Sequence, residues 1–361
     1  MNGILVCSGT AKVKNIGDYI QSVAQEQFYN CADTFVEREH LDSYSSNEET
    51  KVIMNGWFMH HPNHFPPSES IHPLFVSFHI VPRIETSFFT KETINYLKKY
   101  EPIGARDTGT LELLHKYDIK SYFSGCLTLT LGLRYKSNLL QEQKTDVIFV
   151  DPYYRMGSTD GGTLKRYVYA GSLFLKHFKK AKRLYRVFAA EGGNNLPRFL
   201  FPVHKLLAAA SFYDTYSKLF SDKVLFSASY ITHTIHQQNY PTNEQKMEYA
   251  RTLITRYSNA KMVFTSRIHC ALPCLGVETP VVFINSDSLK SGEKRSGGRF
   301  GGLIELFHVL MLNENNSWEY QKNVFPLFNE KIDENFTFEN PKKYKVLRDS
   351  LIEKVQNFII G

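Results

Sequence analysis

Apolar residues along the first third of the chain alternate between short continuous runs and stretches with helical spacing. The continuous runs have the length and the β-branched composition of buried strands. They predict strands at residues 4–7, 51–55, 75–80, 102–105, 121–123 and 128–131. The stretches with helical spacing predict helices at residues 18–28, 91–100 and 108–116. Because strands that are separated by helices usually pair in parallel, the pattern predicts a doubly wound α/β sheet.

The same alternation restarts near Thr145 with a buried-strand run at residues 146–150, so a domain boundary is expected around residues 138–146. Further strands are predicted at 224–227, 262–265 and 281–284, and helices at 163–190, 199–220, 242–258 and in a stretch ending at Ile359. We therefore predict an N-terminal α/β domain at residues 1–140, a C-terminal α/β domain at 141–320 and a helical tail at 321–361. Two Rossmann-like, doubly wound domains that face a cleft resemble the plan of the GT-B glycosyltransferases.

The composition is that of a globular protein. Of the 361 residues, 42% are hydrophobic and 22% are charged, which excludes a disordered or fibrous chain. The 43 basic and 36 acidic residues give a net charge of +7, which suits anionic substrates or a membrane surface without requiring nucleic acid.

Cysteine usage and the absence of targeting segments favour an intracellular protein. The five cysteines lack the spacing of a disulfide framework and are expected to be reduced thiols. The sequence after Met1 lacks the basic and apolar regions of a signal peptide, and no apolar run approaches the roughly 18 residues of a membrane span. We therefore expect a cytoplasmic protein.

The segment that says most about chemistry, residues 262–283, reads as a strand, a polar turn, a short helix and a second strand. Ser266 is the predicted N-cap, which places Arg267 and His269 in the first helical turn at the carboxyl end of a strand. Helix N–H groups already favour an anion there, and a guanidinium adds a bidentate clamp for phosphate or carboxylate. The imidazole can serve as general acid or base. Pro273 predicts that the helix is short or kinked.

This Ser-Arg-Ile-His run, followed by a small-residue helix and Thr279-Pro280-Val281, resembles the signature of the polysaccharide pyruvyl transferase family. Four further segments resemble elements of that family, namely Asn15-Ile16-Gly17-Asp18, Gly104-Ala105-Arg106-Asp107, Ser124-Gly125-Cys126-Leu127-Thr128-Leu129 and Tyr230-Ile231-Thr232-His233. The resemblance covers about residues 1–140 and 220–305, whereas residues 155–215 match no element of the family.

The family transfers the pyruvyl group of phosphoenolpyruvate (PEP) onto sugar hydroxyls, usually as a ketal, so the resemblance implies a PEP-dependent pyruvyltransferase. Its product would be a 4,6-linked ketal on a hexose of a surface polysaccharide, such as a capsule or an exopolysaccharide, or of its lipid-linked precursor. No cofactor is expected beyond PEP as the donor substrate. We assign catalysis to Arg267 and His269, and PEP binding to Arg267, Ser266, Arg106, Arg299 and His233.

Acceptor binding is assigned to residues at predicted strand ends and in an aromatic loop, namely Asn15, Gly17, Asp18, Trp57, His61, His64 and His79. In that loop Trp57, with Phe58 and Phe65, suits a sugar-binding lip along the cleft. No metal site is expected there, although the loop is rich in histidine. Its prolines prevent the helix that paired histidine ligands would need, and no acidic or cysteine cluster completes a ligand set.

Most of these residues also have a structural interpretation. Arg267 and His269 can stabilise a helix start, and the segment at residues 15–18 can form a tight turn with a helix cap. Arg106 can pair with a nearby carboxylate while Asp107 caps the following helix.

Similar alternatives apply to the histidines and cysteines of the second half. His233 and His236 can orient an acceptor hydroxyl or be satisfied structural histidines. Arg299 can close over PEP or lie in a solvated glycine loop. Cys270 and Cys274 lie one helical turn apart and are expected to be buried, unreactive thiols.

The stretch at residues 164–186 contains eight lysines and arginines interleaved with aromatic residues. A solvated helix face packed on the core is the simpler interpretation. Peripheral contact with anionic lipid at the inner face of the cytoplasmic membrane is the alternative.

Two other functions compete with pyruvyl transfer. A GT-B glycosyltransferase that uses a nucleotide sugar suits the fold, but Thr265 and Pro273 stand where many retaining members carry paired glutamates. A noncatalytic saccharide-binding relative is the second alternative, and the presence of both Arg267 and His269 argues against it. The expected partners are PEP and a saccharide acceptor, including one linked to polyprenyl diphosphate, and no nucleic acid.

Overall fold

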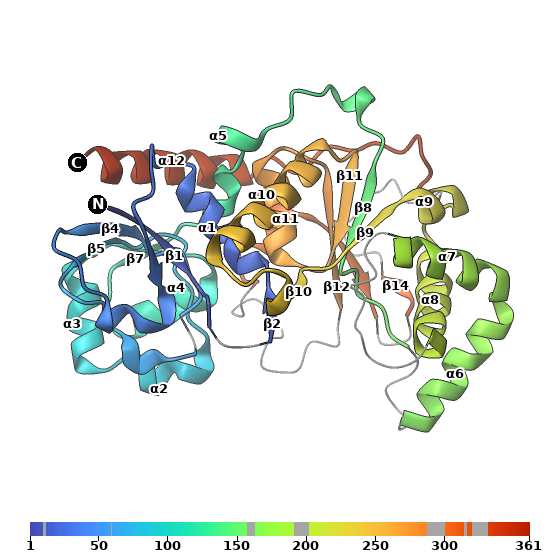
Figure 1. Ribbon diagram of the computed structural model, residues 1–361, viewed down its shortest axis with the longest axis horizontal. Coiled ribbons are helices and arrows are strands. Elements are labelled where there is room, and N and C mark those ends of the chain that lie inside the picture. The colour runs from blue at the N-terminus through green and yellow to red at the C-terminus, as the bar shows by residue number, and fades with distance from the viewer. Residues whose placement is uncertain are drawn as a thin grey trace.

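The computed structural model describes residues 1–9, 12–58, 60–156, 163–190, 202–286, 300–313, 316–319 and 331–361. Within these ranges the protein is a mixed α/β structure with two main sheets and helices packed between and around them (Figure 1). The predicted α/β class with parallel sheets is therefore confirmed.

The first sheet has four parallel strands in the order β3-β1-β4-β5. These strands are β1 (Asn2–Val6), β3 (Thr34–Glu37), β4 (Thr50–Ile53) and β5 (Ile71–Leu74). Next to them β6 (Ile103–Ala105) and β7 (Ser121–Phe123) pair in parallel, and a bridge between Phe78 and Ala105 connects β6 to the chain after β5. Because the strands are parallel, their carboxyl ends lie along one edge of the sheet.

The second sheet has the strand order β14-β13-β12-β11-β8-β9. Its strands are β8 (Val147–Val150), β9 (Ser229–Ile231), β11 (Met262–Thr265), β12 (Val281–Ser286), β13 (His308–Leu312) and β14 (Trp318–Glu319), and all but β14 run parallel. Every residue of β8 and β11 is buried, as expected for central strands of a parallel sheet that helices cover on both faces.

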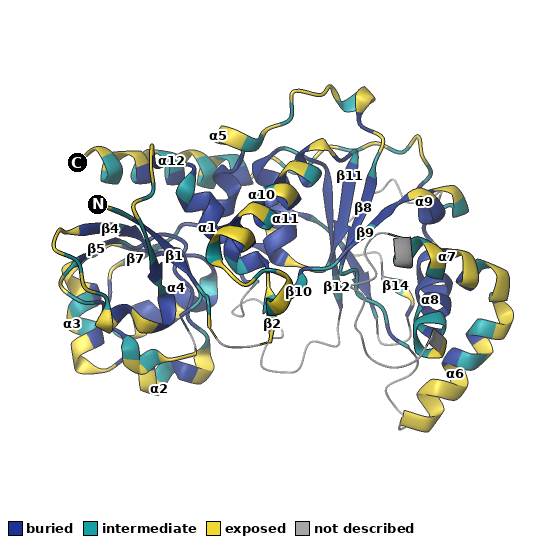
Figure 2. Ribbon diagram, in the orientation of Figure 1, coloured by how far each residue is buried: buried dark blue, intermediate teal, exposed yellow. Residues whose placement is uncertain are grey.

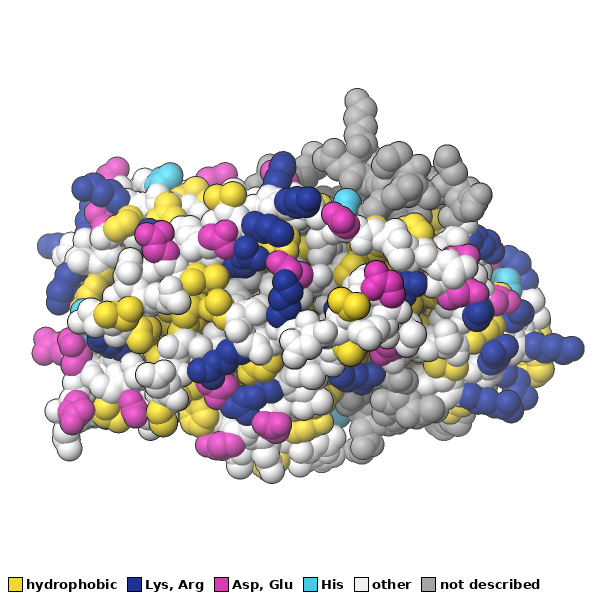
Figure 3. All heavy atoms as spheres, turned by 90° about the horizontal axis from the view of Figure 1, so that it is seen from above, with side chains coloured by type: hydrophobic (Ala, Val, Ile, Leu, Met, Phe, Trp, Pro, Cys, Tyr) yellow, Lys and Arg dark blue, Asp and Glu magenta, His cyan; other side chains and the backbone are white. Residues whose placement is uncertain are grey.

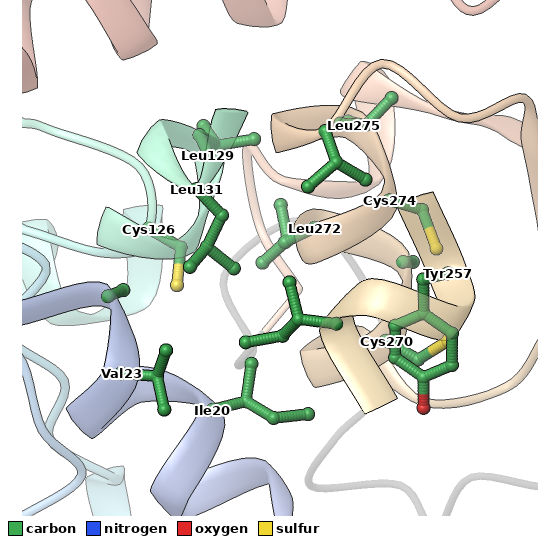
Figure 4. Packing of buried hydrophobic residues seen from close by; sticks show 14 of the residues in the cluster. Ile20, Val23, Cys126, Leu129, Leu131, Tyr257, Cys270, Leu272, Cys274 and Leu275 are labelled. Carbon is green, nitrogen blue, oxygen red and sulfur yellow. The ribbon is translucent and has the colours of Figure 1, made fainter. Parts of the chain in front are cut away.

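Helices α1 (Gly17–Glu26), α10 (Asn243–Asn259) and α11 (Ile268–Gly276) lie between the two sheets (Figure 1). Figure 4 shows their apolar side chains packed together, with Ile20 and Val23 of α1 on one side and Leu272 and Leu275 of α11 on the other. The short 3₁₀ helix η4 (Leu127–Thr130) closes this cluster from the first half of the chain. The two halves therefore share a continuous hydrophobic core.

The remaining α-helices are α2 (Glu85–Phe88), α3 (Lys91–Lys99), α4 (Thr108–Lys116), α5 (Gly132–Tyr135), α6 (Thr163–Lys176), α7 (Phe178–Ala190), α8 (Pro202–Tyr216), α9 (Asp222–Ser227) and α12 (Tyr344–Ile360). The last helix returns to the first sheet, where Lys51 Nζ donates hydrogen bonds to the carbonyls of Phe358 and Ile359, both at 3.2 Å. The helical tail thus contacts the N-terminal half of the molecule. The division into domains near residues 140 and 320 stays a prediction.

Three predicted strands differ from the structure. Residues 224–227 belong to α9 instead, because the Ser221 hydroxyl caps that helix by accepting a hydrogen bond from the Val224 N–H (3.2 Å). Residues 128–131 lie largely in η4, which packs in the shared core rather than in a sheet. The strand predicted at 75–80 is not formed: β5 ends at Leu74, and residues 75–80 form only isolated bridges at Phe78 and His79, with Ser77 at a φ of +56° between them and β5. Short apolar runs do not distinguish a strand from a buried helical turn.

Candidate functional site

Arg267 lies between β11 and α11, at the carboxyl end of a central parallel strand. It is the N-cap residue of α11, and its backbone N–H donates to the Thr265 hydroxyl (2.9 Å). The predicted N-cap, Ser266, instead accepts a hydrogen bond from the Tyr153 N–H (2.9 Å). The predicted N-cap role of Ser266 is wrong because its hydroxyl bonds to the loop after β8 rather than to α11, whereas PEP binding by Ser266 stays a prediction.

The Arg267 guanidinium is held on one side by Asp151, which directly follows β8 and which the sequence reasoning missed. Arg267 Nε donates to Asp151 Oδ2 at 2.8 Å, and 44% of the Arg267 side chain remains exposed. Asp151 turns the chain at the strand end with a φ of +40°. Among the described residues, nothing accepts a hydrogen bond from the terminal amino groups of Arg267. These groups can therefore bind an anionic ligand.

The backbone of His233 forms a hydrogen bond with the same Asp151 carboxylate, and the His233 side chain is buried. Its backbone N–H donates to Asp151 Oδ2 (2.9 Å), and its ring Nε2 lies 2.7 Å from the Tyr257 hydroxyl. Burial disfavours the imidazolium and lowers the pKa of His233 from 6.5 to about 4. The structure therefore places a neutral imidazole next to the Arg267 pair, and direct contact with PEP stays a prediction.

His269, in the first turn of α11, packs against the start of α1. A Cβ atom on Gly17 would lie only 2.7 Å from both Cβ and Nδ1 of His269. Glycine at this position lets the backbone of α1 and the imidazole touch, whereas a larger residue would displace one of them. Two residues that the sequence analysis assigned to different substrates are therefore direct neighbours.

A short antiparallel ribbon connects the Asn15 segment to the His233 segment. It consists of β2 (Val13–Asn15) and β10 (Thr234–His236), with Asn15 opposite Thr234. The Ile16 N–H donates to the His233 carbonyl (2.9 Å), and the Gly17 N–H donates to Asn15 Oδ1 (3.0 Å). Asn15 thus forms the turn that precedes α1, and the ribbon brings this turn to the Arg267 pair. Substrate contact by Asn15 stays a prediction.

Asp18, in the first turn of α1, faces Arg38, a second residue that the sequence reasoning missed. Arg38 is 5% exposed, and its NH1 group lies 3.5 Å from Asp18 Oδ1. It also donates to Glu39 Oε1 and to Cys7 Sγ, both at 3.1 Å. Burial raises the pKa of the Cys7 thiol to about 11, so Cys7 is neutral at pH 7. Arg38 directly follows β3, so the strand-end argument applied to Arg267 could have found it.

Asp18 and Arg38 also line a small polar pocket at the carboxyl ends of β1 and β4. The other residues that line it are Leu5, Val6, Cys7, Gln21, Ser22, Gln25, Asn55 and Gly56. Both polar side-chain atoms of Gln21 are buried without a hydrogen-bond partner in the described chain. A water molecule or a hydroxyl group bound in the pocket would satisfy them.

Arg106, Asp107 and His79 form a buried cluster at the carboxyl edge of the first sheet. His79 Nδ1 lies 2.5 Å from Asp107 Oδ2, and Arg106 Nε lies 3.4 Å from the same oxygen. Asp107 also caps α4 as predicted, since its Oδ1 accepts a hydrogen bond from the Thr110 N–H (2.9 Å). Burial opposes the charge of Asp107, but His79 and Arg106 lower the pKa of this carboxyl to about 2. Arg106 does pair with a carboxylate, and its contact with PEP stays a prediction.

The aromatic loop after β4 is only partly available for a ligand. Phe58 and Phe65 lie in the core of the first half, at 5% and 7% exposure. Their predicted place on an exposed sugar-binding lip is wrong, because both rings complete the packing around Phe78. The Trp57 ring lies 5.6 Å from the His79 ring, beside the Arg106 cluster.

The two histidines of this loop lie next to a second small pocket. His64 Nδ1 lies 2.8 Å from Asp42 Oδ1, and the His61 N–H donates to Glu39 Oε2 (3.0 Å). Both histidines line the pocket together with Arg38. Acceptor binding by His61, His64, Trp57 and His79 stays a prediction.

The remaining predictions concern Arg299, metals and the paired thiols. Arg299 lies outside the described residues. Within the described part of the chain, no three His, Cys, Asp or Glu side chains lie close enough to hold a metal ion. Cys270 and Cys274 are fully buried as predicted, and burial raises the pKa of the Cys274 thiol.

The geometry around Arg267 suits an anionic ligand whose reaction includes a proton transfer. The contact between Gly17 and His269 brings the N-terminal ends of α1 and α11 together. Both helix ends carry partial positive charge and N–H groups, and the guanidinium adds a full charge. His269 supplies an imidazole at the same place.

Comparison with known proteins bears on the whole of this region. Residues 15–288 match the model of the family described as Polysaccharide pyruvyl transferase. The matched span begins at Asn15 and includes both members of the Gly17–His269 contact. No curated protein and no solved structure matches the chain significantly. Because the family match extends over well over half of its length, the chain belongs to the polysaccharide pyruvyl transferase family.

Proposed function

We propose that the protein transfers the pyruvyl group of PEP onto two hydroxyls of a sugar and releases phosphate, with the two sheets as the halves of a GT-B-like arrangement around a cleft. The observation that carries the proposal is the contact of His269 with the Gly17 end of α1, two residues along the chain from Arg267 and its Asp151 partner. Family membership supplies the class of reaction.

Arg267 is suited to bind the anionic groups of PEP. PEP carries a phosphate and a carboxylate, and a partly exposed guanidinium can hold either through two parallel hydrogen bonds. Asp151 holds Nε, and no acceptor among the described residues takes up the terminal amino groups. Arg267 would also stabilise the charge that develops on the phosphate as its bond to carbon breaks.

His269 is suited to the proton transfers. Protonation of the methylene carbon of PEP gives a methyl group and a cation at C2, which the first sugar hydroxyl attacks. The C2–O bond to phosphate then breaks and phosphate leaves. A second hydroxyl closes the ketal. The two sugar hydroxyls give up two protons in total. One replaces the proton that was added to the methylene carbon, and the other leaves with phosphate. A single imidazole can relay both protons.

The acceptor in this proposal is a hexose with free 4- and 6-hydroxyls. It belongs to a surface polysaccharide, such as a capsule or an exopolysaccharide, or to a precursor linked to polyprenyl diphosphate. Asn15, Gly17 and Asp18 lie close to His269 and are the first candidates for contact with it. Arg106, at the carboxyl edge of the first sheet, is a second candidate for contact with PEP.

A thermal-shift panel with PEP, UDP-sugars and inorganic phosphate tests the donor. A ligand at one hundred times its Kd adds about 2.7 kcal/mol to stability, which is easily measured. We expect PEP to stabilise the wild-type protein and to have little effect on Arg267→Ala. The matched control is Arg251→Ala, which removes a half-buried arginine paired with Glu26 at the opposite end of α1.

The outcomes separate the competing functions. Stabilisation by PEP that is lost in Arg267→Ala and kept in Arg251→Ala supports pyruvyl transfer. Stabilisation by UDP-sugars but not by PEP would favour a GT-B glycosyltransferase. If PEP binds but no acceptor saccharide leads to phosphate release, the noncatalytic saccharide-binding relative becomes the better description.

A further inference from the structure

Helix α6 exposes a stripe of apolar residues on the side that faces away from the protein. Leu164, Val168 and Leu175 are 78%, 66% and 78% exposed, and their spacing places them on one face of the helix. The opposite face carries Ala170 and Leu173, which are buried in a cluster that includes Ala210 of α8. Figure 2 shows α6 as one of the most exposed helices of the molecule. Among the described residues, the outer stripe is therefore not needed for packing.

Helix α7 exposes a basic stripe next to it. Lys179, Lys182, Arg183 and Arg186 are exposed at positions i, i+3, i+4 and i+7. The buried residues Ala181 and Leu184 lie on the opposite face of α7, in the protein interior. Figure 3 shows lysine and arginine side chains gathered at the end of the molecule that these helices form.

Helices α6 and α7 carry far more positive charge than the rest of the chain. Residues 163–190 contain eight lysines and arginines and no Asp or Glu, which gives +8. The whole chain carries +7, so all other residues together carry −1. Lys176 pairs with Asp214 and Lys180 with Asp222. The other six, Lys165, Arg166, Lys179, Lys182, Arg183 and Arg186, have no acidic partner in the described chain.

We propose that α6 and α7 form a peripheral contact with a bilayer that contains anionic lipid. The apolar stripe of α6 would enter the boundary between headgroups and acyl chains, as amphipathic interfacial helices do. The basic stripe of α7 would bind the anionic headgroups. Tyr167 and Tyr169 of α6 and Phe178 of α7 are each more than 40% exposed, and the two tyrosines suit the headgroup level. None of the described helices has the length and apolar character needed to cross a bilayer.

The positive charge of α6 and α7 favours an anionic bilayer over a second copy of this chain as the binding partner. The apolar stripe alone would also suit pairing with another helix, since its spacing resembles a heptad. A two-fold interface would bring together two identical surfaces that each carry six basic residues without an acidic partner in the described chain, and like charges at an interface oppose association. A negatively charged bilayer removes that repulsion and covers the same apolar side chains.

Vesicle flotation at physiological salt tests the proposal. The probes are vesicles of phosphatidylcholine alone and vesicles in which about one third of the lipid is phosphatidylglycerol. Each bound basic residue contributes roughly fivefold to partitioning, so reversing Lys179, Lys182, Arg183 and Arg186 to Glu should lower binding at least ~100-fold. The control reverses four exposed lysines of the first half, namely Lys91, Lys98, Lys99 and Lys120. A third variant, Leu164→Ser with Val168→Ser and Leu175→Ser, tests the apolar stripe.

We expect binding only to the anionic vesicles, loss in the α7 variant, weakening in the α6 variant and no more than about threefold change in the control. Binding that is indifferent to anionic lipid, or equal loss in the control, would overturn the proposal. A dimer that the α6 variant disrupts, without vesicle binding by the wild type, would assign the surface to a second copy instead. The assay contains no substrate, so its result is independent of the proposed pyruvyl transfer.

Discussion

Two arginine–aspartate pairs lie at carboxyl ends of parallel strands, and they differ in burial. Arg267 and Asp151 meet at 2.8 Å with the guanidinium 44% exposed. Arg106 and Asp107 meet at 3.4 Å with side-chain exposures of 3% and 1%, and Asp107 also pairs with His79. The Arg267–Asp151 pair is partly exposed to solvent, whereas the Arg106–Asp107 pair is buried in the protein interior.

The difference in burial separates a guanidinium that is accessible to a ligand from a pair on which the stability of the fold depends. An exposed ion pair contributes little to stability, so Asp151 mainly orients Arg267. A buried pair depends on its partners, because a charge left alone in the interior is costly. Asp107 has several partners, since Thr110 donates to its Oδ1 through both the backbone N–H (2.9 Å) and the hydroxyl (3.0 Å). The comparison makes opposite predictions for mutations of the two pairs.

The largest expected effect is loss of stability in Asp107→Asn. The substitution removes the negative charge and leaves Arg106 and His79 buried without it, so we expect the free energy of unfolding to fall by about 3–5 kcal/mol. Urea unfolding measures the change. The control is Asp349→Asn, whose carboxylate is 63% exposed and pairs with Arg348, and it should change stability by less than about 1 kcal/mol. Equal effects of the two substitutions would contradict the assignment of Asp107 to the stability of the interior.

The next effect is a dependence of stability on pH that comes from His233. Its folded pKa of about 4 lies below the unfolded value of 6.5, so the folded state keeps it neutral while the unfolded state takes up a proton. The contribution is fully present above pH 6.5 and is lost as the pH falls toward 4, by an amount on the order of 2–3 kcal/mol.

Unfolding measured from pH 7.5 to 4.5 in wild type and in His233→Gln isolates this term, since the variant should show a shallower loss. The exposed His115 serves as the control, and His115→Gln should follow the wild-type curve. If the curves of wild type and His233→Gln are parallel, His233 is not held neutral by burial, and the interior behind the Arg267 pair is more polar than its packing indicates.

A smaller effect on activity is expected for Arg267→Lys. Lysine keeps the positive charge but loses the planar fork that binds phosphate or carboxylate through two hydrogen bonds. We expect kcat/KM for PEP to fall about 30-fold, roughly 2 kcal/mol of transition-state binding, with the melting temperature almost unchanged. Arg251→Lys is the matched control on a half-buried pair away from the candidate site and should retain activity. A drop in melting temperature with normal kinetics would place Arg267 with the buried pair instead.

Local sequence patterns predicted the elements that carry the site well. The strand at 262–265 and the helix at 108–116 have the predicted bounds, because their apolar spacing and their polar caps agree. Arg267 and His269 lie at a strand end as expected, because strand, turn and helix follow one another directly in the sequence. The predicted N-cap was wrong because the Ser266 hydroxyl bonds to the Tyr153 N–H and Arg267 occupies the N-cap position, and the sequence around Ser266 does not indicate the contact with Tyr153.

Local sequence patterns could not predict contacts between segments that are far apart in the chain. Nothing near Arg267 in the sequence indicates Asp151 as its partner, although a carboxylate directly after a buried strand is itself a signal. Phe58 and Phe65 show the same limit, because whether an aromatic loop residue is exposed depends on the strands that it meets in the folded chain. The contact between Gly17 and His269 likewise required the structure.

The smallest expected effect concerns this contact and uses two glycines as a pair. In Gly17→Ala the new methyl group would lie 2.7 Å from Cβ and Nδ1 of His269, whereas at Gly171 in α6 no atom lies within 4 Å. Gly171→Ala should therefore raise stability by about 0.5–1 kcal/mol through helix propensity and leave activity unchanged. Gly17→Ala should displace the imidazole and lower kcat about tenfold, with a smaller effect on KM for PEP, because the proposed function assigns donor binding to Arg267 rather than to His269. If kcat is unchanged while stability falls, the contact serves helix packing alone, and the proton transfer must be assigned to a different group from His269.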